Sequence, residues 1–327
     1  MGIIQRDSLS LDSIAGLVED ALEGLVMDSL SNRQEMPAMS IAKEVLLSGG
    51  KRYRPIVGLI SYKAAGGNDL SEVMNLALSA ELIHTATLIH DDVYDRSMMR
   101  RGKPTIQSSH GIAHAIIAGD YLFSLGFKLG AGYSPEIVKR VGEACAGVAS
   151  GELMQFKHVR NLNTKPEDYY AIVDGKTAGA FACGCSCSAI NADSDEEIVD
   201  GLWGYGIELG RAFQLVDDLL DLVGDDSIGK PRGTDVHEGK MTLPLIYALT
   251  MLHGEDRKQL EDTLTNFSDF RLQELQALLE KAGSFDYARL LISNHVERAI
   301  DSLEEIPESN AKDLLIDLAE LSMSRTN

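Results

Sequence analysis

The sequence predicts an all-α fold, arranged as one large helical domain over residues 1–327. Long stretches repeat apolar residues with the 3.6-residue period of a helix, as in 9–30, 70–89 and 202–223. Helix-start signals are frequent, such as Ser134 before Pro135 and the capping boxes that begin at residues 164 and 194. Alternating runs of β-branched residues, which are typical of strands, are absent.

Breaks that contain Gly or Pro separate the expected helices, and about a dozen helices follow from this pattern. The breaks fall near 48–51, 66–69, 102–104, 130–135 and 224–233. The last stretch, 252–327, alternates charged residues on amphipathic helices, and we interpret it as a peripheral, solvated layer. Every motif discussed below lies between residues 49 and 240.

The charge balance excludes several classes of partner. Lys and Arg number 30 against 50 Asp and Glu, and a formal charge of −20 disfavours nucleic acid and anionic membranes. The longest apolar stretch, 113–132, is interrupted by Asp120 and Lys128, so we expect no transmembrane segment. The N-terminus shows no signal peptide, and four cysteines in 327 residues fit a reducing compartment, so we expect a cytoplasmic protein.

Two segments share the pattern Asp-Asp-x-x-Asp, and each closes an apolar helical stretch. Residues four apart share a helix face, so Asp91 is expected beside Asp95, and Asp217 beside Asp221. Like charges at that spacing destabilise a bare helix, and a hard cation such as Mg²⁺ would compensate them. Two solvated acidic helix ends are the alternative. The predicted metal-binding residues are Asp91, Asp92, Asp95, Asp217 and Asp221.

Cationic loops accompany these clusters. The first, 48–55, places Lys51 and Arg54 behind a pair of glycines, whose freed amides could also hold a phosphate; a plain helix-joining turn is the alternative. The second, 100–104, follows the first acidic cluster, and the third, 229–235, follows the second, with Lys240 beyond it. This pattern suits a diphosphate that is held by metal on one side and by Lys or Arg on the other.

Together these segments resemble the trans-type polyprenyl diphosphate synthases. The matching segments are GGKRYRP, ELIHTATLIHDDVYD, RRGKPT, GKTAGA, FQLVDDLLD and GKPRGTD. The resemblance implies an isoprenoid-synthase type helix bundle around a central cavity, and a homodimer. It also implies a prenyltransferase that ionises an allylic diphosphate with about three Mg²⁺ ions per site and adds isopentenyl diphosphate to the cation. The product would be an all-trans polyprenyl diphosphate.

The same resemblance assigns roles to individual residues. Those expected to hold isopentenyl diphosphate are Lys51, Arg54, His84 and Arg101. Those expected to hold the allylic diphosphate are Arg100, Lys176, Lys230 and Lys240. Thr177 and Gln214 would offer oxygens near the developing carbocation, while Asp92, Asp221 and Asp235 would support the directly metal-binding aspartates. Arg100, Lys176, Thr177, Gln214 and Lys230 form the expected catalytic set.

Product length is predicted from residues just before the first acidic cluster. By resemblance the floor of the pocket lies at Ala86 and Thr87, where short-product members tend to carry aromatic residues. Helical geometry independently places Thr87 on the same face as His84 and Asp91. Both candidate residues are small, so we expect a product of geranylgeranyl length or longer.

Three other functions remain open at this level. A His-Asp type metal-dependent phosphohydrolase would use His84, His90 and Asp91, but would not need the second acidic cluster. A class I terpene cyclase would share the acidic helices and lack the isopentenyl-binding loop. A non-catalytic regulatory subunit of a synthase would be expected to lose one acidic cluster, and both are present.

Overall fold

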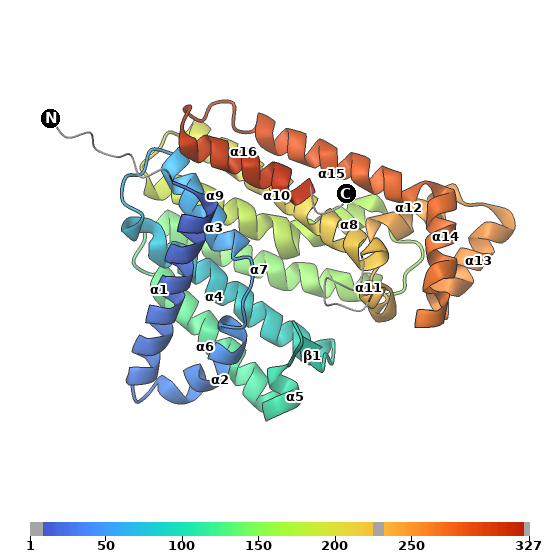
Figure 1. The fold of residues 1–327 in the computed structure, drawn as a ribbon, viewed down its shortest axis with the longest axis horizontal. Coiled ribbons are helices and arrows are strands. Elements are labelled where there is room, and N and C mark those ends of the chain that lie inside the picture. The colour runs from blue at the N-terminus through green and yellow to red at the C-terminus, as the bar shows by residue number, and fades with distance from the viewer. Residues whose placement is uncertain (1–8, 225–231, 324–327) are drawn as a thin grey trace. The chain divides into compact units, whose positions relative to one another are not determined.

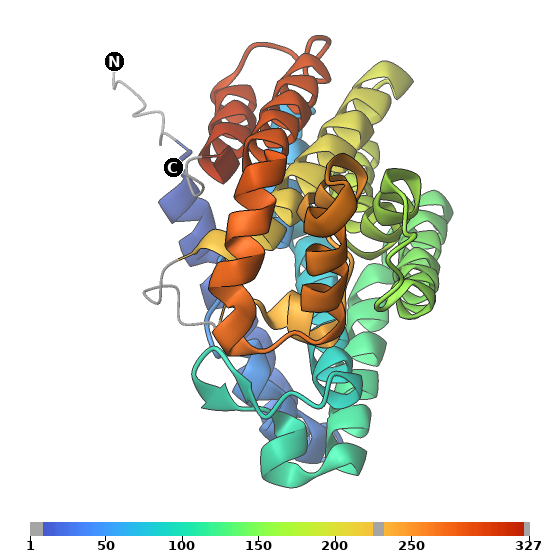
Figure 2. The same ribbon diagram turned by 90° about the vertical axis from the view of Figure 1, so that its right-hand side faces the viewer.

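The structure, a computed structural model, describes residues 9–224 and 232–323. Over these two ranges nearly all regular structure is helical, apart from two strands of two residues each. The coiled ribbons of the helices dominate Figure 2. The predicted all-α class is therefore confirmed. Figure 1 labels the elements along the chain.

The first half of the chain contains helices and one short hairpin. These elements are α1 (Leu11–Ser31), α2 (Met36–Leu46), α3 (Tyr53–Ala64), α4 (Ser71–Tyr94), β1 (Met99–Arg100), β2 (Lys103–Pro104), α5 (Ile106–His110), α6 (Ile112–Gly130) and α7 (Pro135–His158). The second half contains helices only, among the residues described there. They are α8 (Pro166–Val173), η1 (Asp174–Ala178), α9 (Gly179–Asn191), α10 (Glu196–Val223), α11 (Thr234–Glu238), α12 (Leu243–Met251), α13 (Gly254–Thr265), η3 (Asp269–Arg271), α14 (Leu272–Ala282), α15 (Ser284–Asp301) and α16 (Asn310–Met323).

Most predicted helix starts are found where the sequence places them. Helix α7 begins at Pro135, α8 at Pro166 and α10 at Glu196. The caps of α8 and α10 each lie one residue after the predicted Thr164 and Ser194. At α8 the backbone N–H of Lys165 donates to Asp168 at 3.0 Å, and at α10 the Asp195 carbonyl accepts from Val199 at 3.1 Å. Such shifts are expected where neighbouring polar residues compete for the same free amide.

The described residues form two compact units, each built from three stretches of the chain. Among the described residues, unit 1 takes those of 9–141, 183–203 and 303–317, and unit 2 those of 142–182, 204–302 without 225–231, and 318–323. The expectation of one domain over the whole chain stays a prediction. Each unit is described by itself below.

In unit 1, α4 packs along α6, as Figure 1 shows. Glycines on α6 permit the close approach: a Cβ atom on Gly119 would lie 2.2 Å from the His90 ring, and one on Gly126 would lie 2.9 Å from Ile83. His90 also stacks on Phe123 of α6, with ring centroids 6.0 Å apart. These contacts fix the rotation of α4 about its axis and hence the direction of the aspartates at its end.

In unit 2, the last turns of α10 pack into an apolar core. Leu215 and Leu219 of α10 are fully buried there, together with Leu275 and Leu279 of α14 and Ile292 of α15. The C-terminal helices therefore do more than form the solvated outer layer that charge alternation suggests. Their apolar faces support the helix that carries the second acidic cluster.

By length and composition alone, helix α6 is long and apolar enough to cross a membrane. A third of its most apolar stretch is buried in the structure. From the sequence we expect no transmembrane segment, because Asp120 and Lys128 interrupt the stretch. The tight packing of its glycines on α4 is what a helix of a folded core shows. The absence of a transmembrane segment stays a prediction.

Candidate active site

The first acidic cluster closes α4 in unit 1. Asp91 and Asp92 lie in its last turn, and Asp95 is its C-cap, with the Asp95 N–H donating to the Asp91 carbonyl at 2.9 Å. The Asp91 carboxylate accepts a hydrogen bond from the Tyr94 hydroxyl. Asp91 and Asp95 are both only partly buried, as expected for residues four apart on one face.

Asp92 lies in a different environment. It is 2% exposed and accepts a fork of hydrogen bonds from Arg100, with Nε 2.9 Å and Nη2 2.9 Å from Oδ1. Burial raises the pKa of Asp92 although Arg100 opposes the shift. A carboxylate held in this way orients Arg100, which fits the supporting role that the sequence gives it.

The basic segment after α4 is a β-hairpin where the sequence predicts only a loop. Strands β1 and β2 pair antiparallel, and the two turn residues Arg101 and Gly102 both have positive φ, at 50° and 73°. Positive φ at both central residues is the signature of a type I′ turn, which matches the twist of the flanking strands. The turn requires Arg101 to adopt the left-handed backbone conformation, which is unfavourable for a residue with a side chain. It thereby fixes the position of the Arg101 Cα, from which the side chain extends.

The glycine pair of the first basic loop receives Arg101. Its guanidinium donates to the Gly49 carbonyl, and a Cβ atom on Gly50 would lie 3.0 Å from Nη1. Gly49 and Gly50 have φ of 85° and 153°, which side chains rarely adopt. Loop 48–55 and the hairpin therefore contact each other where the Arg101 side chain lies against the backbone of the two glycines.

A cationic cluster results around His84 of α4. Burial, followed by the charges of Arg54, Arg101 and Arg100, lowers the pKa of His84 well below its usual value. Burial lowers the pKa of Arg54 to about 10, and burial with neighbouring arginines lowers that of Arg101. Lys51 is exposed, with its ammonium 5.9 Å from the centre of the Tyr53 ring. The predicted residues are thus brought together, with His84 neutral among positive charges.

Arg52 belongs to the same motif but faces inward. It is 5% exposed and pairs with Glu81 at 2.7 Å and Glu19 at 2.8 Å, while Nη2 donates to the Leu46 carbonyl at 2.7 Å. Arg52 is therefore a structural anchor of loop 48–55. Sequence reasoning gave it no role, although a buried acid such as Glu81 on an apolar helix face required a cationic partner.

The second acidic cluster closes α10 in unit 2, and its members have specific donors. Asp218 is 3% exposed and accepts from the Tyr169 hydroxyl at 2.6 Å and the Gln214 amide at 2.9 Å. Asp221 accepts from the backbone N–H groups of Thr234 at 3.0 Å and Asp235 at 3.1 Å. These are the first residues of α11, so the Asp221 carboxylate caps that helix.

Negative charges accumulate at this cluster. Burial and the charge of Asp235 raise the pKa of Asp218 to about 8 and that of Asp221 to about 7. Burial also raises the pKa of Asp235, and Asp217 and Glu238 add to that shift. Lys240 offsets part of the negative charge, 3.4 Å from Asp235 and 2.5 Å from Glu238.

Lys176 and Thr177 lie on η1, a single π-helical turn, and such turns frequently occur at functional sites. Lys176 pairs with Glu152 of α7 and donates to Gln155 at 3.0 Å. The Thr177 hydroxyl donates to the Gln214 oxygen at 3.0 Å, and the Gln214 amide in turn donates to Asp218. This direction of donation leaves the lone pairs of the Thr177 oxygen available.

The remaining predicted residues are placed as follows. Ala86 is fully buried in α4, whereas Thr87 is partly exposed and donates to the His84 carbonyl at 2.7 Å. Lys230 lies outside the described residues. Within the residues that the structure describes, no three His, Cys, Asp or Glu side chains form a ready-made metal cage.

Comparisons with known proteins agree over most of the chain. The polyprenyl synthetase family matches residues 37–281. The all-trans-nonaprenyl-diphosphate synthase (geranyl-diphosphate specific) of Rhodobacter capsulatus is 33% identical over 318 residues, which are 96% of this chain and 97% of that protein.

The chain belongs to the polyprenyl synthetase family. A second relative, the octaprenyl diphosphate synthase of Escherichia coli, is 33% identical over 330 aligned positions that cover 99% of both chains. The crystal structure of a Caulobacter crescentus polyprenyl synthase complexed with calcium and isoprenyl diphosphate superposes with a TM-score of 0.88, at 31% identity, over 98% of this chain and 100% of that one. The predictions of a prenyltransferase and of the polyprenyl synthase family are confirmed.

Several residues of the synthase site were not found by sequence reasoning. Tyr169, which holds Asp218, precedes the GKTAGA motif and carries no signal of its own. Asp218 itself is one residue from Asp217, and a helix turns about 100° per residue, so its different direction could have been anticipated. The depth of its burial could not, because this depends on α8 packing beside α10.

The raised pKa values predict that the metal-free synthase loses stability as pH rises. Asp218, Asp221 and Asp235 have pKa values above their ordinary 3.8 in the folded state, so the folded state binds more protons than the unfolded chain. Their stabilising protonation is complete below pH 3.8 and is lost as pH rises through about 7 and 8. We expect the melting temperature in EDTA to fall by about 5 °C between pH 6 and 8.5.

Single substitutions separate the contribution of the buried aspartates to the pH dependence of stability from that of the exposed carboxylates. Asp218→Asn should reduce the slope of melting temperature against pH, whereas Asp286→Asn, whose side chain is 89% exposed, should leave it unchanged. Differential scanning calorimetry measures both. A slope that is equal in wild type and Asp218→Asn would contradict the assignment.

Proposed function

We propose that this synthase condenses isopentenyl diphosphate with an allylic diphosphate and releases an all-trans polyprenyl diphosphate of geranylgeranyl length or longer. The observation that supports this most directly is the pair of like-charged clusters built on its motifs. One gathers cations around His84, and the other gathers carboxylates around Asp218. Each is destabilised by its own repulsion, and each therefore favours a ligand of opposite charge.

The cationic cluster is proposed to hold the diphosphate of isopentenyl diphosphate through Lys51, Arg54, His84 and Arg101. Burial lowers the pKa of Arg54, and burial together with the charges of Arg52 and Arg100 lowers that of Arg101; a bound anion would stabilise both charged forms. The guanidinium fork matches phosphate oxygens. His84 stays neutral and can donate one hydrogen bond without adding a further positive charge.

The acidic clusters are proposed to bind Mg²⁺ through Asp91, Asp95 and Asp217, with Asp92, Asp221 and Asp235 in support. The donors are carboxylate oxygens, which suit a hard cation, and burial, followed by the charge of Asp235, raises the pKa values of Asp218 and Asp221. The lack of a ready-made cage among the described residues fits an ion that binds few carboxylates and completes its shell with substrate phosphates. When bound, Mg²⁺ supplies counter-charge to the departing diphosphate.

The chain's own residues are proposed to carry the rest of the ionisation. Arg100, Lys176, Lys240 and Lys230 offer positive charge to the allylic diphosphate as the carbon–oxygen bond breaks. The Thr177 oxygen, with its proton committed to Gln214, turns lone pairs toward the developing allylic cation. The isopentenyl double bond then adds to this cation, and the proton that leaves the adduct can pass to the released diphosphate.

We expect purified protein with Mg²⁺, labelled isopentenyl diphosphate and an allylic primer to extend the primer. Asp91→Asn and Asp217→Asn should each lower the rate by at least about 100-fold, because each removes charge that holds the metal. Chromatography of the labelled products measures both. Asp286→Asn, an exposed aspartate in unit 2, is the matched control and should keep the rate.

Other outcomes of the same assay would assign another function. Phosphate release without chain extension would indicate a phosphohydrolase. Formation of a cyclic hydrocarbon would indicate a terpene cyclase. No turnover in a folded wild type would indicate a regulatory subunit.

Product length is proposed to depend on Ala86 and Thr87. Thr87→Phe should shorten the product, since this position is partly exposed on the face that also carries His84 and Asp91. Ala86→Phe should shorten it as well and also lower the melting temperature, because Ala86 is fully buried. Mass spectrometry of the products measures the length. Unchanged length in both variants would place the floor of the pocket elsewhere.

We also propose a homodimer in the cytoplasm. Ile112, Ile116, Phe123 and Phe127 follow one stripe of α6, and all but Phe123 are more than 40% exposed. Exposed apolar stripes of this kind mark interaction surfaces. No disulfide joins the four cysteines, all of which lie within the described ranges, and this is consistent with a reducing compartment.

Charge placed on the α6 stripe should break the dimer. We expect the double variant Ile116→Lys with Phe127→Lys to run as a monomer in light scattering, while wild type runs at twice the chain mass. Met27→Lys on α1, at a residue that is 68% exposed, should leave the dimer intact. A wild type that is monomeric at all concentrations would contradict the proposal.

A further inference from the structure

The π turn η1 is packed between two helices of unit 2 at unusually short range. On one side, a Cβ atom on Gly175 would lie 2.9 Å from the Gly147 carbonyl of α7, and one on Gly151 would lie 3.0 Å from Lys176. On the other side, a Cβ atom on Gly210 of α10 would lie 2.5 Å from the Cα of Ala178. The backbone of η1 is thus packed directly against α7 and α10 at these glycines. Even a small rotation of η1 would bring its atoms into steric conflict with those helices.

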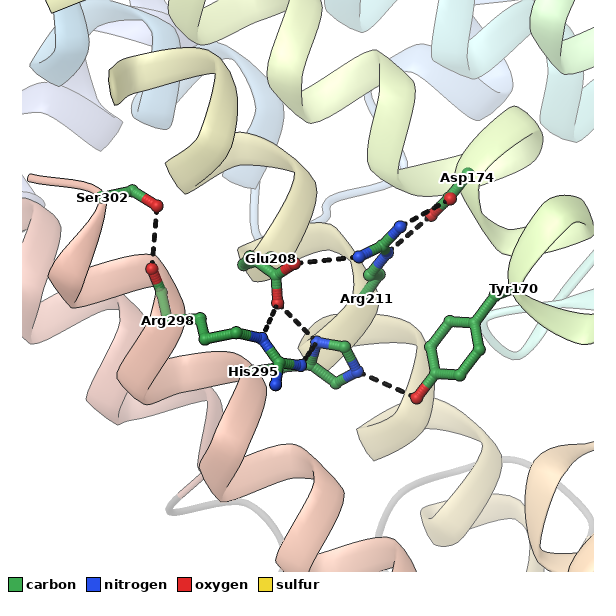
Figure 3. A network of polar contacts seen from close by, with 7 residues as sticks. All are labelled: Tyr170, Asp174, Glu208, Arg211, His295, Arg298 and Ser302. Carbon is green, nitrogen blue, oxygen red and sulfur yellow. Dashed lines mark hydrogen bonds and ion pairs between the residues drawn. The ribbon is translucent and has the colours of Figure 1, made fainter. Parts of the chain in front are cut away.

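A polar clamp begins at the first residue of the turn. Asp174 receives both branches of the Arg211 guanidinium, with Nε 2.7 Å from Oδ1 and Nη2 2.7 Å from Oδ2. Figure 3 shows this fork between η1 and α10. The hydrogen bond with Asp174 raises the pKa of Arg211, so the pair stays charged. Bidentate pairs of this kind fix orientation as well as distance.

Arg211 is linked to α15 through Glu208, which lies one turn earlier on α10. Its Nη1 donates to Glu208 at 2.9 Å, and the other Glu208 oxygen accepts from Arg298 at 2.8 Å and from His295 at 2.6 Å. His295 is 2% exposed, and its Nε2 lies 3.0 Å from the Tyr170 hydroxyl (Figure 3). Although burial opposes it, hydrogen bonding from His295 and Arg298 lowers the pKa of Glu208 to about 2.

We propose that Arg211 is a positioning residue for Lys176 and Thr177, and that Glu208 and His295 connect this function to α15. A π turn contains one residue more than the α-helix it interrupts. If the turn relaxed to α-helical geometry, Lys176 and Thr177 would rotate by about 100° relative to their present directions. The Arg211–Asp174 fork opposes that relaxation from outside the turn. This inference rests on the proposed function, in which Lys176 and Thr177 act on the allylic substrate.

The test compares two arginines with similar surroundings. Arg211→Gln removes the fork, and Arg271→Gln removes a fork on Glu274 of α14 that does not contact η1; the side chains are 25% and 22% exposed. We expect Arg211→Gln to lower kcat about tenfold or more, since small misplacements of acting groups are costly. Its KM for isopentenyl diphosphate should stay within twofold. Arg271→Gln should keep kcat, even where it lowers the melting temperature as much.

Two further variants exclude a merely structural effect. Arg211→Lys should recover part of kcat, because an ammonium can still pair with one Asp174 oxygen. The double variant Asp174→Asn with Arg211→Gln should be no slower than the worse single variant, because both changes remove one interaction. A kcat within twofold of wild type for Arg211→Gln, or a double variant as slow as the product of both effects, would overturn the proposal.

Hydrogen exchange provides a readout that does not depend on turnover. Amides of 174–182 should exchange faster in Arg211→Gln than in wild type and in Arg271→Gln. If wild type extends no primer, the proposed function fails, while exchange still decides whether Arg211 holds the turn. Equal exchange in all three proteins would overturn the positioning role.

Discussion

Repulsion between like charges that the fold holds close together is the constraint on which the rest of the structure depends. In unit 1, burial and then the charges of Arg54, Arg101 and Arg100 lower the pKa of His84 well below its usual value. In unit 2, burial raises the pKa values of Asp218 and Asp221, and the charge of Asp235 raises both further. Neither arrangement would be selected for stability alone, because each costs free energy in the absence of a counter-ion. In the proposed function, a diphosphate and a divalent cation are the ligands that remove these two costs.

Such clusters persist because surrounding residues over-determine their geometry. Arg52 ties loop 48–55 to Glu81 and Glu19, and Asp92 orients Arg100. Tyr169 and Gln214 hold Asp218. These partners are buried or partly buried and donate or accept in defined directions, so the charged groups cannot turn away from one another. Destabilisation at the site is thus sustained by hydrogen bonds around it.

Besides forming turns, glycine allows helices of this fold to pack closely against neighbouring elements. On α6 and α10 it removes the side chain at points where another element approaches, as at Gly119 and Gly210. The close approach fixes helix rotation, and rotation decides the direction of Asp91 on α4 and of Thr177 on η1. The polar network from Asp174 to His295 adds directional contacts to this packing. Residues far from the motifs in sequence therefore determine how the motifs are presented.

The helical class, the family, the two acidic clusters and most of the cations could be predicted from the amino-acid sequence. Each of these depends on local spacing: a 3.6-residue period, a four-residue separation of aspartates, or a short motif. Only the tertiary structure decided that Arg52 and Asp92 face inward, that residues 99–104 form a hairpin, and that Lys176 and Thr177 lie on a π turn. Those outcomes depend on which groups are removed from water and which partners meet them. Burial and long-range pairing are properties of the packed chain, and no local spacing encodes them.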